Sequence, residues 1–134
     1  MIYQREIQLP TSGHREMHDL TSQVARIVCE SRVRAGMVHI FNVGSTGAIG
    51  TIEFEPGLQQ DLPAMLDKLF PPSRDYGHER AWHDGNGHSH LQATMLGPRS
   101  PFRSKRANSF WALGSKSSSW SATSNRAGAQ SWSL

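Results

Sequence analysis

Blocks of apolar residues separated by polar turns run through the first 98 positions and predict alternating strands and helices. Period-two patterning predicts strands over residues 2–9, 37–43 and 48–54, and the apolar run 91–96 predicts another. Apolar spacings of three and four predict helices over residues 19–32 and 57–70. Strands outnumber helices and are closely joined, so we predict an α+β fold: a mainly antiparallel sheet with two helices.

Residues 99–134 break this pattern. About one third of them are serine, none is acidic, and the apolar positions follow neither a strand nor a helix period. Such a segment buries too little apolar surface to offset the entropy lost on ordering. We therefore predict one incomplete domain over residues 1–98 and a tail, 99–134, whose C-terminal strands are missing or disordered.

Cysteine content and charge limit the class of protein. Cys29 is the only cysteine, which excludes an internal disulfide framework and is typical of a reducing, cytoplasmic location. No apolar run is long enough for a membrane span, so no membrane partner is expected. The basic, acid-free tail resembles a nucleic-acid-binding segment, with Arg103, Lys105, Arg106 and Trp111. We do not expect nucleic-acid binding, because the tail is explained better by the altered reading frame described below.

The segment 82–90, Trp-His-Asp-Gly-Asn-Gly-His-Ser-His, carries the strongest chemical signal. If a strand begins at His88, its side chain and that of His90 share one face. Two imidazoles with Asp84 and Asn86 nearby can bind a divalent metal or a phosphate. The alternative is a polar hairpin loop that is rich in histidine by chance.

Four motifs together resemble the YjbQ family, also known as UPF0047 and as secondary thiamine-phosphate synthases. They are N-V-G-S-T-G-A-I-G-T-I-E at 42–53, D-L at 61–62, Y-G-H at 76–78 and D-G-N-G-H-S-H-L at 84–91. The resemblance implies a small α+β protein that forms a homotrimer with sites near subunit contacts. It also implies a synthase activity that joins a pyrimidine diphosphate to a thiazole phosphate.

The resemblance further implies roles for individual residues, and several alternatives stay open. Mg²⁺ or Zn²⁺ is the expected cofactor, with a small phosphorylated substrate. A non-enzymatic trimer that binds metal or phosphate is the alternative function, and this copy could be inactive. Family members often carry histidine where this chain has Gly44. The implied catalytic residues are Glu53, Asp84 and Asn86, the phosphate-cradling residues are Ser45 and Thr46, and the metal or phosphate ligands are His78, His88 and His90.

The resemblance ends abruptly after Gly97 and Pro98, and a change of reading frame explains why. Residues 111–121 fix the first two bases of nearly every codon and leave the third base largely free. The same bases can be read in another frame, in which each third base is joined to the first two bases of the next codon. That reading permits G-T-W-Q-Q-I-F-F-L-E, which matches the family's continuation. The same offset continued to residue 134 permits an ending in T-I-V-V-T, again like the family's. We therefore predict that the chain from about Arg99 onward is translated out of frame.

Overall fold

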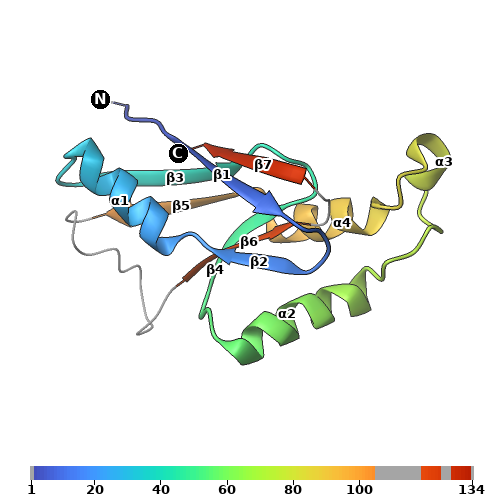
Figure 1. The fold of residues 1–134 in the computed structure, drawn as a ribbon. Helices are drawn as coiled ribbons and strands as arrows, with labels where there is room; N and C mark the ends of the chain where they lie inside the picture. Colours follow the sequence, from blue (N-terminus) through green and yellow to red (C-terminus); the bar gives the residue numbers. More distant parts are fainter. Residues whose placement is uncertain (1, 105–118, 125–127, 134) are drawn as a thin grey trace.

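The computed structural model describes residues 2–104, 119–124 and 128–133 (Figure 1). The helices are α1 (Thr21–Ser31), α2 (Pro56–Leu69), α3 (Glu79–Trp82) and α4 (Gly87–Leu96). The strands are β1 (Glu6–Thr11), β2 (Glu16–Asp19), β3 (Gly36–Asn42), β4 (Ala48–Ile52), β5 (Arg99–Ser104), β6 (Ser119–Ser124) and β7 (Gly128–Ser133).

Two sheets carry the fold, and every strand pair in them is antiparallel. The first has the order β1-β7-β3-β5 and the second the order β2-β6-β4. The predicted α+β class with a mainly antiparallel arrangement is therefore confirmed. Pro10 lies inside β1 without disrupting pairing, because β1 is an edge strand and proline removes only a donor that such an edge can spare.

The core forms where α1 packs against the inner faces of the strands. Alternation along β1 buries Ile7 and Leu9, and one stripe of α1 supplies Val24, Ile27 and Val28. The buried strand residues thus recur at every second position and the buried helix residues every three or four, as the sequence indicates. The complete cluster is Ile7, Leu9, Leu20, Val24, Ile27, Val28, Ile40 and Ile49.

Both predicted helices are confirmed as α1 and α2, and the described part of the chain has two more, α3 and α4. The strand predicted over 91–96 is helix α4, so the shared face expected for His88 and His90 is wrong as well. Residues two apart in a helix point about 200° away from each other. Gln92, Ala93, Met95 and the leucines of this run are good helix formers, whereas β-branched residues are nearly absent.

The tail contributes strands in this structure, contrary to the prediction that they are missing or disordered. β5 pairs with β3, β6 lies between β2 and β4, and β7 lies between β1 and β3. Backbone groups on open strand edges require partners whatever side chains accompany them. Almost any extended segment can supply these partners, so strand positions are filled even by an unpatterned sequence.

The second helix differs from its prediction in burial. Pro63 and Leu66 are its buried residues, whereas Met65 and Leu69, which are apolar and belong to the predicted helix 57–70, are 44% and 53% exposed. Its start is firmly capped, since the Glu55 carboxylate accepts the backbone N–H of Gly57 at 2.7 Å and that of Leu58. Among the described residues, no helix has the length and apolar character required to cross a bilayer.

Candidate functional site

A buried carboxylate organises the corner between α3 and α4. Glu79 is only 6% exposed, and its side chain accepts the backbone N–H of Gly85 at 2.9 Å and of Gly87 at 3.4 Å. Gly85 has a φ of +75°, which permits the tight turn that brings both amides to one carboxylate. The guanidinium of Arg74 lies 3.8 Å from the same carboxylate and donates to the carbonyl of His83 at 3.2 Å.

His78, Asp84 and His90 lie together over this turn. Nε2 of His78 is 3.3 Å from Oδ1 of Asp84 but makes no hydrogen bond. The ring centroids of His78 and His90 lie 4.6 Å apart. The ring of His78 also stacks on that of Trp82, with centroids 6.4 Å apart. Slight desolvation raises the pKa of Asp84, but a backbone hydrogen bond from Asn86 and the charge of His78 outweigh it and leave the pKa below its usual value.

Asn86 connects this cluster to the first turn of α4. Its side-chain amide donates to Oδ2 of Asp84 at 2.8 Å, and its backbone carbonyl accepts the N–H of Ser89. Its own Oδ1 is buried and makes no hydrogen bond. A buried amide oxygen without a hydrogen-bond partner costs free energy, which a bound ligand or ion could recover.

His88 lies on the opposite side of α4 and has different neighbours. Its ring meets the ring of His14 edge-on at 5.1 Å and lies 6.5 Å from the ring of Tyr76. Nε2 is 3.2 Å from the hydroxyl of Ser89, and the buried Nδ1 has no hydrogen-bond partner. Burial, with a further contribution from His14, lowers the pKa of His88, while nearby Asp67 partly opposes the shift.

Asp67 of α2 binds three side chains in the neighbourhood of His88. It accepts hydrogen bonds from His14 Nε2 at 3.1 Å, Arg15 Nε at 2.6 Å and Gln92 Nε2 at 3.1 Å. Burial raises the pKa of Asp67, but these hydrogen bonds outweigh burial and hold it below its ordinary value. The four residues join the β1–β2 turn, α2 and α4, and we did not identify them from the sequence as one group.

Ser45 and Thr46 lie in the turn between β3 and β4, and Glu53 directly follows β4. The turn that holds Ser45 and Thr46 adjoins the C-terminal end of α4, because Asn42 N and Ile49 N donate to the carbonyls of residues 98 and 97. That end is about 13 Å along the helix axis from His88. Glu53 is exposed and follows β4, a five-residue strand about 16 Å long that begins just after the turn.

The structure therefore brings together four of the eight candidate residues, namely His78, Asp84, Asn86 and His90. Gly87 leaves little room for change there, since an added Cβ would lie 2.8 Å from the Cβ of Tyr76. Among the described residues, no three His, Cys, Asp or Glu side chains are already positioned to hold one metal ion. The sequence signal that was overlooked is Glu79, a carboxylate placed before a Gly-x-Gly turn.

Comparison with known proteins agrees with this fold. The family model described as UPF0047 protein YjbQ-like matches residues 5–105. A UPF0047 protein of Methanothermobacter thermautotrophicus is 38% identical over 96 residues, which cover 72% of this chain and 66% of that protein. A UPF0047 protein of Archaeoglobus fulgidus is 39% identical over 92 residues, 69% of each chain. The matched part thus spans about two thirds of the length of these relatives.

Solved structures match over nearly the whole chain. A YbjQ-like protein of unknown function from Sulfolobus solfataricus has a TM-score of 0.85 and 28% identity, covering 98% of this chain and 93% of its own. An uncharacterised YjbQ/UPF0047 protein from Clostridium acetobutylicum has a TM-score of 0.84 and 27% identity, covering 97% and 98%. From the family model, the relatives and the shared fold, the chain belongs to the YjbQ-like UPF0047 family.

Proposed function

We propose that His78, Asp84 and His90 bind a divalent cation, and that this cation binds the phosphate of a small phosphorylated substrate. The spacing between His78 Nε2 and Asp84 Oδ1, 3.3 Å without a hydrogen bond, is the observation that carries the proposal. Two donor atoms bound to one tetrahedral zinc ion, each about 2.1 Å from it, lie about 3.4 Å apart. Imidazole nitrogen with carboxylate oxygen is a donor set that zinc accepts.

Local charge favours a cation over a bare phosphate. Glu79 already occupies two backbone N–H groups at the start of α4, where an anion would otherwise bind. Asp84 adds a second negative charge beside His78. A phosphate would meet two carboxylates here, of which Arg74 partly neutralises that of Glu79. A divalent cation would neutralise Asp84 and supply positive charge to the phosphate oxygens.

Completing the site would require movement of a third ligand, since no three candidate side chains among the described residues are positioned around one metal ion. Two donors already have ligand spacing, and the third, His90, is half-buried with its ring in contact with that of His78. Rotation of His90 about its side-chain bonds would turn a nitrogen toward the pair. The buried Oδ1 of Asn86, which has no partner, is a further oxygen donor in the same corner.

Calorimetric titration with Zn²⁺ tests the cation site. We expect one site per chain in the parent protein and at least about a tenfold loss of affinity in His78→Ala and Asp84→Asn, because each removes one of about three ligands. His83→Asn is the matched control, since it removes a neighbouring exposed imidazole and asparagine tolerates its φ of 56°. Unchanged Zn²⁺ affinity in both ligand variants would refute the proposal.

The resemblance supports a specific reaction at this site, that of the thiamine-phosphate synthases. The thiazole nitrogen forms a bond to the methylene carbon of the pyrimidine diphosphate, and the bond from that carbon to the diphosphate oxygen breaks. Holding both substrates in line and neutralising the leaving diphosphate are the contributions a protein makes to such a step. The motif D-x-N-x-H-x-H-L at 84–91 is the observation that favours this reaction.

Incubating the purified chain with both substrates and measuring thiamine phosphate tests the reaction. We expect product formation that Asp84→Asn reduces at least about tenfold, in proportion to its loss of Zn²⁺ affinity. Zn²⁺ binding without product would instead support the alternative, a non-enzymatic protein that binds metal and phosphate. The homotrimer implied by the resemblance stays a prediction, which sedimentation velocity can check.

A further inference from the structure

An exposed tryptophan adjoins the proposed cation site. Trp82 ends α3 and is 72% exposed, although its ring lies against that of His78, with centroids 6.4 Å apart and planes 20° apart. The same histidine ring also contacts that of His90. The indole therefore lies next to the proposed ligands, and most of its surface is available to a second flat ring.

Arg74 lies over the turn that holds Asp84. Its Nη2 is 3.2 Å from the place that a Cβ on Gly85 would take, and its Nη1 donates to the carbonyl of His83. The Arg74 side chain is 72% exposed, and within the described part of the chain its Nη2 and Nε make no hydrogen bond. Guanidinium donors in this state bind phosphate oxygens, often through two parallel hydrogen bonds.

The spacing of these groups sets the size of the substrate that fits. The Trp82 ring lies 6.4 Å from the ring of His78, whose Nε2 is a ligand in the proposed cation site. An aromatic ring joined to a phosphate through one methylene group and an ester oxygen covers a comparable distance. One end of such a molecule can stack on the indole while the other end reaches the cation.

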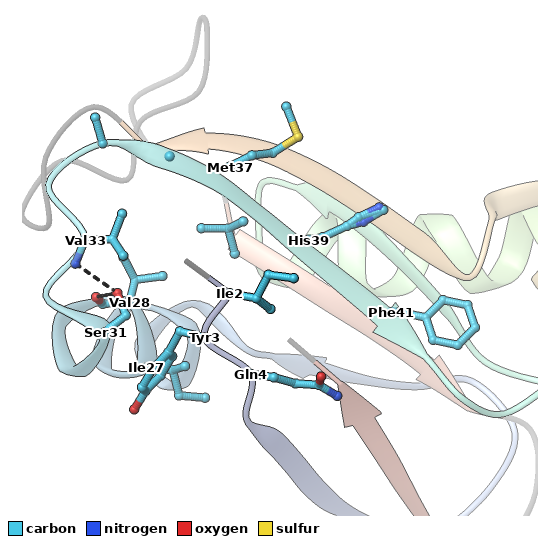
Figure 2. A pocket seen from close by; sticks show the side chains of 13 residues that line it. Ile2, Tyr3, Gln4, Ile27, Val28, Ser31, Val33, Met37, His39 and Phe41 are labelled. Atoms are coloured by element: carbon cyan, nitrogen blue, oxygen red, sulfur yellow. Dashed lines mark hydrogen bonds between the residues drawn. The ribbon is translucent and has the colours of Figure 1, made fainter.

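A cavity at the opposite end of the molecule does not offer this combination. It has a volume of about 640 Å³ and lies between residues 2–4, the end of α1 and the first half of β3 (Figure 2). Figure 1 shows α3 at the other end. Among the described residues that line the cavity, none is Asp, Glu, Lys or Arg. A phosphate would lose hydration there without gaining an ionic partner, so the corner at Trp82 is the favoured place for it.

We propose that Trp82 and Arg74 select the substrate of the cation site. Trp82 stacks on a planar aromatic ring, and Arg74 shares the attached phosphate with the cation. The substrate class is therefore a phosphate or diphosphate ester with a flat ring close to the ester oxygen. This inference rests on the proposed function, because the cation supplies the other half of the phosphate binding. Neither residue is a cation ligand, so each can be replaced without removing one.

Two phosphate esters that differ only in their ring test the role of Trp82. Benzyl phosphate has an aromatic ring, and cyclohexylmethyl phosphate has a saturated ring of nearly the same size. Calorimetric titration into the Zn²⁺-loaded chain should show a preference for benzyl phosphate of at least about fivefold, because stacked aromatic rings attract each other beyond the area they bury. We expect Trp82→Leu to abolish this preference. Phe41→Leu removes an exposed aromatic ring from β3 and is the matched control that should keep it.

Arg74→Gln tests the phosphate half of the proposal. We expect it to weaken both esters alike, by at least about fivefold, because it removes a charged donor and leaves the indole in place. A parent chain that binds Zn²⁺ but binds both esters equally would overturn this inference and leave the cation site standing. So would a Trp82→Leu chain that loses Zn²⁺ and both esters in parallel, since the indole would then only support His78. A parent chain that binds no Zn²⁺ would refute the proposed function and this inference with it.

Discussion

Replacing Glu79 with alanine is expected to destabilise the chain by about 2 kcal/mol and to weaken Zn²⁺ binding at least about tenfold. The Glu79 carboxylate is 6% exposed and accepts the backbone N–H groups of Gly85 and Gly87. Without it, two amides of a tight turn lose their acceptor, and alanine restores neither hydrogen bond. Asp84 and Asn86 lie in the same turn, so their positions depend on a residue that is not itself a ligand.

Glu6→Ala is the control for this variant, because Glu6 is exposed on the edge strand β1 and its replacement should change stability by no more than about 0.5 kcal/mol. Urea unfolding measures the stability of both variants, and titration calorimetry measures their Zn²⁺ affinity. A Glu79→Ala chain that keeps the parent's affinity would show that the turn holds its shape without the carboxylate. The explanation of the site given above would then be wrong.

The sequence predicts the core of this fold better than it predicts the site. The stripe of Val24, Ile27 and Val28 and the alternation of Ile7 and Leu9 require only the periods of a helix and a strand, and both predictions are confirmed. The short strand β2 and the four-residue helix α3 were not predicted. Elements of one turn or four residues carry too few positions for either period to be recognisable.

The prediction of the site depended on whether a strand or a helix begins near His88. A strand at His88 places it beside His90, whereas the helix that forms sends the two rings to different neighbours, His14 and His78. The residue types were correct for metal chemistry, but the pairing was set by tertiary contacts: Asp67 lies 21 residues before His88 in sequence and still draws His14 toward it. Patterns within nine residues cannot indicate such contacts.

Restoring the reading frame after Pro98 is expected to stabilise the chain strongly. In the restored frame, G-T-W-Q-Q-I-F-F-L-E replaces a serine-rich segment with alternating and apolar residues that suit a half-buried strand. Each additional fully buried Ile, Leu or Phe contributes about 1.5–3 kcal/mol, so a few of them should raise Tm by about 10 °C or more. Thermal unfolding of the 134-residue chain and the restored chain, followed by circular dichroism, measures the difference.

The encoding DNA provides a check that does not depend on stability. The frame hypothesis requires particular third bases in the codons for residues 111–121, since only those allow the family's ending. A coding sequence with other third bases would contradict it, and the tail would then be a segment proper to this chain.

A restored chain with a scrambled order of the same residues is the control for composition. If the scrambled chain is stabilised equally, the gain comes from apolar content alone, and the strand positions now taken by β6 and β7 do not discriminate between sequences.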